Sequence, residues 1–481
     1  MLGRKATMTP TDEQQAILDR PPTGTIKVLA GAGCGKTSTL VQYAARWPGR
    51  GLYLAFNSAI AREAAARFPR NIEARTAHSF AFRQLGFSRG KPELVNRYLD
   101  RHLDPFEALI RPVPGVPQAR LRSLILGTID RFLIDEGTRI SHRHCDLADK
   151  TQNRAVREIA GAITLKLLKF ADHDLPITHD TYLKQFEMKQ RIAGFDYLLL
   201  DEAQDLNPVL ISIARKAGLP TIVVGDPYQS IYRFRGAVDA MDAFDAEELT
   251  LTQSWRFGQA IAQVANAILR HSSKPPRHRL TGNPAITTTI TRYGGRVAMQ
   301  PGTAILARTN ARLFQSLAGI DRPFHLVGGI RDLHRQLTSA HALAQGQRHR
   351  VADESIARFS SWRNLEYAAD HGDGEMRRVR DIVDQHGPRL ATLLERLNGL
   401  HRDAEADAQI VVSTAHKAKG REWDNVVVLD DFDPPADLAA RRRGDAKKTV
   451  DTDQQINLLY VACTRARRRL YLAPPLHDAL A

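Results

Sequence analysis

The sequence predicts an α/β protein with two parallel-sheet cores, each interrupted by a helical insertion. Short apolar runs end where polar motifs begin, which is typical of buried parallel strands. Helical patterns such as 59–67 separate these runs, and this alternation indicates a parallel sheet. The length of 481 residues is too great for one hydrophobic core. The runs fall at 25–29, 51–55, 197–201 and 221–225, and again at 303–307, 410–413, 425–429 and 470–472.

The order of the strand runs divides the chain into four segments. Two regions with helical, polar patterns and little strand character interrupt the two sets of strands. We expect a first core from residues 1–85 and 191–250 with a helical insertion at 86–190, and a second core from residues 251–330 and 409–481 with a shorter helical insertion at 331–408.

The charge balance is strongly basic. Lysine and arginine number 68 and aspartate and glutamate 53, so the formal net charge is +15 and the isoelectric point is near 9.9. Such a balance favours a polyanionic partner such as nucleic acid. A basic protein from an arginine-rich proteome has the same balance, so the motifs must decide between the two interpretations.

The remaining composition is that of an ordinary globular protein, at 43% hydrophobic and 25% charged residues. We find no apolar run long enough to span a membrane and no signal peptide after Met1. The cysteines, Cys34, Cys145 and Cys463, are far apart, which fits a reducing compartment rather than a disulfide framework. We therefore expect a cytoplasmic protein, nucleoid-associated if bacterial, with no membrane partner.

A glycine-rich loop follows the first predicted strand and precedes a helix. Its glycines let backbone N–H groups converge on phosphate oxygens, and the helix N-terminus adds its positive dipole end. Lys36 is expected to reach the β- and γ-phosphates of ATP, and Thr37 to place its hydroxyl on Mg²⁺. The ATP-binding residues of this loop are Gly31, Ala32, Gly33, Cys34, Gly35, Lys36, Thr37 and Ser38.

Adjacent carboxylates follow the third predicted strand, in the segment Asp201-Glu202-Ala203-Gln204-Asp205. Mg-ATP hydrolysis needs such a pair. Asp201 is expected to hold Mg²⁺ through water, and Glu202 to act as general base for the attacking water. An acidic strand end could also cap a helix, but the upstream glycine loop favours the catalytic interpretation.

Together with these two motifs, four later segments resemble the motifs of superfamily 1A helicases, the UvrD, PcrA and Rep-like DNA helicases. They are 225–237 for motif III, 251–258 for motif IV, 413–423 for motif V and 459–466 for motif VI. Segments 178–184, 253–258 and 457–460 are most similar to the F-box DNA helicase branch. The sequence leaves no room for an F-box before the first core.

The resemblance implies two RecA-like cores of the P-loop NTPase class, domains 1A and 2A, with insertions 1B and a short 2B. It also implies ATP and Mg²⁺ as cofactors, bound between the cores. Gln14 is then expected to hydrogen-bond adenine, Trp255 to stack on it, and Glu422 to contact the ribose. The catalytic set implied by the family is Lys36, Asp201, Glu202, Gln229, Arg256 and Arg465, with Gln229 and the two arginines at the γ-phosphate.

Single-stranded DNA is held by basic grooves with aromatic platforms. The motifs place candidate contacts at strand ends in both cores. In the first core these are Phe56, Asn57, Thr76, His78, Tyr232, Phe234 and Arg235, and in the second core Thr414 and His416. A buried aromatic side chain is more often part of a hydrophobic core, so Phe56 and Phe234 have that alternative.

The function implied by the resemblance is that of an ATP-dependent helicase or translocase. It would move 3′ to 5′ on single-stranded DNA, unwinding duplex or displacing bound protein. Its partners would be single-stranded DNA and junctions of single- and double-stranded DNA, in repair or recombination. The alternative is a DNA-sensing ATPase subunit that regulates a partner such as a nuclease in a repair or defence complex.

Overall fold

The structure, a computed structural model, describes residues 9–55, 57–87, 93–169, 175–231, 240–294, 300–370, 373–442 and 445–480. The chain folds into two compact units. The first comprises the chain up to Ala30 together with Gly35–Leu251. The second comprises Gly31–Cys34 together with the chain from Thr252 onward.

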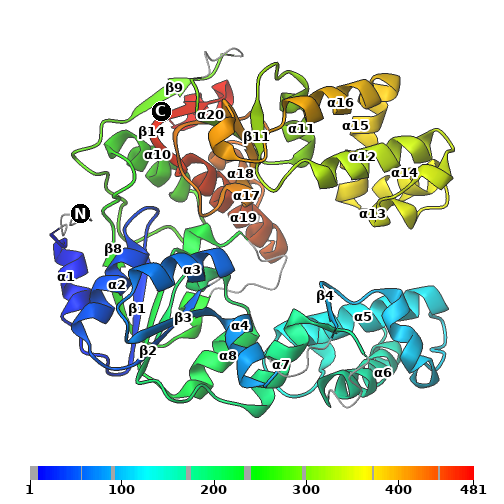
Figure 1. Cartoon of the computed structure of the whole chain (residues 1–481), viewed down its shortest axis with the longest axis horizontal. Coiled ribbons are helices and arrows are strands. Elements are labelled where there is room, and N and C mark those ends of the chain that lie inside the picture. The colour runs from blue at the N-terminus through cyan, green and yellow to red at the C-terminus, as the bar shows by residue number, and fades with distance from the viewer. Residues whose placement is uncertain are drawn as a thin grey trace. The chain divides into compact units, whose positions relative to one another are not determined.

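The first unit is built on a parallel sheet in the order β3-β2-β6-β7-β1-β8 (Figure 1). The inner strands β2, β6 and β7 are buried along their whole length, as expected where helices cover both faces of a sheet. The parallel direction brings the carboxyl ends of all six strands to one edge. The strands are β1 Thr25–Ala30, β2 Gly51–Ala55, β3 Ile72–Thr76, β6 Tyr197–Leu200, β7 Thr221–Gly225 and β8 Glu247–Leu251.

Helices connect these strands, and several begin directly after a strand. Asn57 and Thr76 cap the helices that follow β2 and β3, because each side chain accepts a hydrogen bond from a backbone N–H in the first turn. The helices are α1 Asp12–Leu18, α2 Lys36–Arg46, α3 Ser58–Arg67, α4 Ala77–Gln84, α8 Pro208–Ala217 and α9 Ala240–Ala243, with 3₁₀ turns η3 Ala203–Asp205 and η4 Pro227–Gln229.

The insertion of the first unit is mainly helical and has a hydrophobic core of its own. Leu121 and Ile125 of α5 pack in one buried cluster with Val156 and Ile163 of α6. In Figure 1, α5 and α6 lie beside one another, away from the six-stranded sheet of their unit. The elements are β4 Leu94–Val95, η1 Asp100–Leu109, α5 Gln118–Ile134, η2 His142–His144, α6 Lys150–Lys169, β5 Ile177–Thr178 and α7 His179–Lys189.

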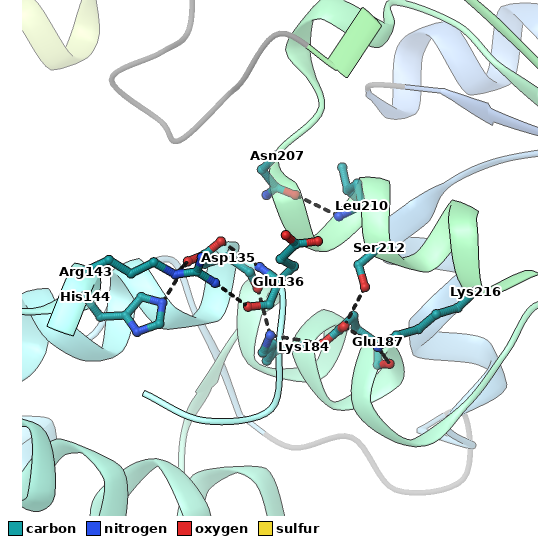
Figure 2. A network of polar contacts seen from close by, with 10 residues as sticks. All are labelled: Asp135, Glu136, Arg143, His144, Lys184, Glu187, Asn207, Leu210, Ser212 and Lys216. Atoms are coloured by element: carbon teal, nitrogen blue, oxygen red, sulfur yellow. Dashed lines mark hydrogen bonds and ion pairs between the residues drawn. The ribbon is translucent and has the colours of Figure 1, made fainter. Parts of the chain in front are cut away.

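A buried ion pair joins this insertion to the core of the first unit (Figure 2). Lys184 and Glu187 of α7 are fully buried, and Lys184 Nζ lies 3.0 Å from Glu187 Oε2. Lys184 also donates to the backbone carbonyl of Asp135, just after α5, at 2.7 Å. From α8, Ser212 Oγ donates to Glu187 Oε1 at 2.7 Å, and Lys216 pairs with the same carboxylate. The network therefore ties α5 and α7 to α8.

Lys184→Met is expected to lower the free energy of unfolding by about 3 kcal/mol, because it leaves the buried Glu187 carboxylate with less compensation. The measurement is urea denaturation followed by circular dichroism. Lys189→Met is the matched control, because Lys189 is exposed near the end of the same helix. Equal midpoints for the two variants would show that the pair does not stabilise the unit.

The second unit contains another parallel sheet, in the order β11-β12-β10-β13-β14-β9. Its strands are β9 Thr289–Arg292, β10 Thr303–Ala307, β11 Phe324–Leu326, β12 Ile410–Thr414, β13 Trp423–Val428 and β14 Ala466–Leu472. Its helices outside the insertion are α10 Gln259–Leu269, α11 Asn310–Ala318, α17 Ala415–Ala418, α18 Pro435–Ala440, α19 Ala446–Cys463 and α20 Pro474–Leu480, with η8 Glu405–Asp407.

The insertion of the second unit shares one hydrophobic core with its sheet. Ile305 and Val412 of the strands pack in the same buried cluster as Leu337, Val379 and Leu394 of the insertion. Among the described residues, this insertion therefore packs into the core of its sheet, whereas the insertion of the first unit has a cluster of its own. Its elements, yellow to orange in Figure 1, are α12 Arg331–Ala344, η6 Arg348–Arg350, α13 Glu354–Ala357, α14 Trp362–Asp370, α15 Gly374–His386, η7 Gly387–Arg389 and α16 Leu390–Leu400.

The predicted fold class is confirmed, since both sheets are parallel and helices connect their strands. Within the described ranges, no helix has the length and apolar character needed to cross a membrane.

Candidate nucleotide and DNA sites

The glycine loop leads from β1 into α2, as the sequence predicts. Gly33 and Gly35 have φ angles of +74° and +79°, which L side chains rarely adopt. Gly35 is the N-cap of α2, and Lys36 and Thr37 form the first turn of that helix. Unpaired backbone N–H groups and the positive dipole end of a helix attract anions. The start of α2 is therefore suited to a phosphate group.

The acidic pair follows β6, the neighbour of β2 and β7. Asp201 is 2% exposed, and its Oδ1 accepts the backbone N–H of Glu202 at 2.9 Å. Glu202 has a φ of +52°, and no other non-glycine residue among those described has a positive φ. A non-glycine residue in this region costs about 1–3 kcal/mol and persists only where its surroundings hold it, often at functional sites. This strain supports a functional role for Glu202.

Two contacts hold the Glu202 carboxylate. Gln204 Nε2 donates to Glu202 Oε2 at 2.5 Å, and Lys36 Nζ lies 3.8 Å from the same oxygen. Lys36 therefore lies between the phosphate-binding end of α2 and the candidate base. The structure thus brings together, within the first unit, the lysine and both carboxylates that the sequence assigns to hydrolysis.

The Asp201 carboxylate is held by two hydroxyls. Its Oδ2 accepts hydrogen bonds from Thr37 Oγ1 at 2.7 Å and from Tyr53 Oη at 2.8 Å. Burial and the nearby Glu202 raise the pKa of Asp201, while Lys36, Thr37 and Tyr53 act in the opposite direction. The hydrogen bonds therefore favour the ionised form against desolvation.

The Thr37 and Asp201 oxygens fit a Mg²⁺ ion, which prefers oxygen ligands and keeps several waters beside one or two carboxylates and substrate phosphates. Among the described residues, no cluster of three or more histidine, cysteine, aspartate or glutamate side chains could hold a metal by protein ligands alone. A site with few protein ligands is what nucleotide-bound Mg²⁺ uses.

A chain of hydrogen bonds connects Glu202 with Gln229, the predicted γ-phosphate sensor. Gln204 Oε1 accepts the backbone N–H of Asp226 at 3.0 Å, and Gln229 Nε2 donates to Asp226 Oδ2 at 2.7 Å. Gln204 and Asp226 are thus functional candidates that the sequence analysis did not assign. Sequence analysis could have selected both residues because they lie within the second and third motifs.

The remaining candidates of the first unit lie around α2. Gln14 on α1 donates through Nε2 to Thr39 Oγ1 at 3.0 Å, next to the loop helix. Ser38 accepts a hydrogen bond from Arg67 of α3 at 2.8 Å. Ala32 and Cys34 of the loop, which group with the second unit, are buried, at 0% and 2% exposure.

The arginine candidates of the second unit differ in exposure. Arg256 is partly exposed, pairs with Glu422 at 2.6 Å, and donates to the Thr464 carbonyl at 3.0 Å. Burial raises the pKa of Glu422, but Arg256, Arg467 and Arg465 together hold it below its ordinary value. Arg465 is 1% exposed and donates through Nε to the Val461 carbonyl at 2.8 Å.

Of the candidates in the second unit, Arg256 and Glu422 are brought together by their ion pair. Trp255 is half-buried and lies four residues after β8.

The described DNA candidates share one local geometry. Thr76 and Thr414 end the strands β3 and β12, and Asn57 lies two residues after β2. Each caps the next helix, and their side-chain oxygens accept from the Ile60, Ser79 and Lys417 N–H groups. His78 lies in the first turn of α4, with Nε2 3.4 Å from Asp180 Oδ1, and His416 is partly buried in α17. Phe56, Tyr232, Phe234 and Arg235 lie outside the described residues.

Residues 136–246 match the model of the UvrD/REP helicase N-terminal domain. This stretch contains the acidic pair after β6 and the motif after β7. The chain belongs to the UvrD-like helicases.

The most similar relatives found by comparison include two F-box DNA helicases. F-box DNA helicase protein 1 of Schizosaccharomyces pombe is 30% identical over 96% of this chain and 57% of its own length. F-box DNA helicase 1 of Gallus gallus is 30% identical over 98% of this chain and 50% of its own. ATP-dependent DNA helicase PcrA of Leuconostoc citreum is 25% identical over 68% of this chain and 51% of its own. The chain thus spans about half the length of these relatives.

Proposed function

We propose that this chain is an ATP-driven motor that moves 3′ to 5′ along single-stranded DNA and unwinds duplex or displaces bound protein. The observation that carries the proposal is the convergence of Lys36, Thr37, Asp201 and Glu202 at the carboxyl edge of one parallel sheet. Ligands of α/β proteins bind at this edge. Membership of the UvrD-like helicases supports the substrate class.

Each of these residues has a role that its contacts suit. The α2 N-terminus and Lys36 bind the phosphates, and Thr37 and Asp201 hold Mg²⁺, which neutralises phosphate charge when bound. Glu202, held by Gln204, accepts the proton of the attacking water. Family resemblance assigns Gln14 and Trp255 to adenine, Glu422 to ribose, and Gln229, Arg256 and Arg465 to the γ-phosphate.

The DNA track in this proposal uses helix N-termini beside strand ends. Asn57, Thr76 and Thr414 stand at such N-termini, where backbone dipoles favour phosphate. Contacts of this kind with the DNA backbone do not distinguish one base sequence from another. The aromatic candidates Tyr232 and Phe234 are assigned to base stacking by the resemblance alone.

DNA binding is expected to fall steeply with salt and to show no base preference. A protein that contacts 6–10 phosphates loses about 10³–10⁵ in affinity between 50 and 200 mM salt, and this chain carries a net charge of +15. Fluorescence anisotropy with mixed-sequence, oligo-dT and oligo-dA strands measures both properties. A flat salt dependence, or strong selection of one sequence, would count against a backbone track.

The direction of movement is tested by strand displacement on duplexes with a 3′ tail or a 5′ tail. The proposal expects ATP-dependent displacement from the 3′-tailed duplex alone, and displacement of streptavidin from a biotin at the 5′ end of a single strand. Displacement only from the 5′-tailed duplex would overturn the polarity. DNA-stimulated hydrolysis without any displacement would instead favour a DNA-sensing subunit that acts on a partner such as a nuclease.

A further inference from the structure

Tyr53 of β2 is a buried tyrosine whose hydroxyl lies at the carboxyl ends of the strands in the first sheet. The side chain is 0% exposed, and its ring lies against Phe68, with 4.8 Å between the ring centroids. β2 pairs in parallel with β6, so the strand that carries Tyr53 adjoins the strand that Asp201 directly follows. Its hydroxyl donates to Asp201 Oδ2 at 2.8 Å. The hydroxyl lies on the ring axis, so a ring flip does not move this donor.

With this contact, three hydrogen bonds orient the Asp201 carboxylate. Oδ1 accepts the Glu202 N–H at 2.9 Å, and Oδ2 accepts from both Thr37 and Tyr53. The Thr37 hydroxyl gives its hydrogen to Asp201, which leaves its oxygen lone pairs for a cation. Without Tyr53, the Thr37 hydroxyl would be the remaining side-chain donor to Oδ2.

The phenol is suited to be a permanent donor. The Tyr53 side chain is closed to solvent, so its single O–H has Asp201 Oδ2 as acceptor rather than water. A merely packed tyrosine needs no such partner. Tyr43 of α2 shows this, because it is equally buried and its hydroxyl has no hydrogen-bond partner among the described residues.

We propose that Tyr53 is a positioning residue of the nucleotide site, which orients Asp201 so that the Thr37–Asp201 pair is arranged in advance to hold the Mg²⁺ of Mg-ATP. The inference rests on the proposed ATP hydrolysis. It predicts that Tyr53 affects the metal-dependent part of nucleotide binding and leaves the metal-independent part unchanged. Outer-sphere partners of metal ligands contribute about 10–100-fold to metal affinity or activity.

The test compares Tyr53→Phe with Tyr43→Phe in the full chain. Both changes remove one buried tyrosine hydroxyl and keep the ring. The affinity for a fluorescent ADP analogue is measured in EDTA and across a Mg²⁺ titration, together with the Mg²⁺ concentration that gives half-maximal ATP turnover. Urea denaturation of both variants monitors folding.

Tyr53→Phe is expected to reduce the Mg²⁺-dependent gain in ADP affinity about 10-fold, with affinity in EDTA unchanged. Its half-maximal Mg²⁺ concentration should rise, and excess Mg²⁺ should restore turnover. Tyr43→Phe should match the wild type in every measurement. The inference is overturned if both variants show the same Mg²⁺ dependence, or if Tyr53→Phe loses affinity equally with and without Mg²⁺. Absence of ATP turnover in the wild type would instead refute the proposed function.

Discussion

Lys36→Ala is expected to lower ATP turnover by at least about 10³-fold, the lower value found for removing one positive charge from a phosphoryl-transfer site. Lys36 opens α2 directly after the glycine loop, and its Nζ lies 3.8 Å from Glu202 Oε2. Removal of the ammonium group takes away the charge that stabilises the transferred phosphoryl group. It also removes the ion pair between Lys36 and Glu202.

The same variant should bind single-stranded DNA with near wild-type affinity, because Lys36 belongs to the phosphate loop. Steady-state hydrolysis and anisotropy with a labelled oligonucleotide measure the two properties side by side. Lys166→Ala provides the control, since Lys166 is exposed on α6 of the insertion. Turnover near that of the control variant would contradict the assignment of this loop to ATP binding.

Glu202→Gln is expected to reduce turnover by about 10²–10⁴-fold while ATP still binds, since that is the usual contribution of a positioned general base. Glutamine has the same shape but cannot accept the proton of the attacking water at neutral pH. The strained backbone at Glu202 and the Gln204 hydrogen bond hold the side chain in place. The variant should therefore accumulate the ATP-bound state.

Equilibrium titration with a fluorescent ATP analogue and single-turnover hydrolysis separate binding from chemistry. Glu63→Gln serves as control, because Glu63 is an exposed residue of α3 in the same unit. If Glu202→Gln hydrolyses ATP at the wild-type rate, another group takes the proton. If ATP binding is lost together with hydrolysis, Glu202 acts in binding or folding.

The strands that sequence reasoning missed are the edges of both six-stranded sheets and the short pair β4 and β5 in the first insertion. Four strands were expected in each core, and each sheet has six among the described residues. The missing ones are β3 and β8 in the first sheet and β9 and β11 in the second. Edge strands have one open side and tolerate polar residues, as the sequences Ile-Glu-Ala-Arg-Thr of β3 and Thr-Ile-Thr-Arg of β9 show. Because apolar runs indicate burial, they predict the inner strands and do not predict the edge strands.

For the candidate site, too, the sequence predicts some residues and not others. Motif spacing assigned Lys36, Asp201 and Glu202, because their roles depend on local strand–loop–helix geometry. Tyr53 lies 148 residues from Asp201 along the chain, and nothing in its apolar strand indicates which carboxylate its hydroxyl meets. The same holds for Ser212, whose contact with Glu187 depends on the packing of α7 against α8. Tertiary contacts of this kind become visible only in the folded chain.

ATP hydrolysis by the purified chain, measured with and without single-stranded DNA, tests the central claim most directly. The motor proposal predicts turnover that requires Mg²⁺, rises at least about tenfold with a saturating DNA strand, and disappears in Lys36→Ala. Turnover that DNA leaves unchanged, or that survives the loss of Lys36, would contradict a DNA-driven ATPase built on this site.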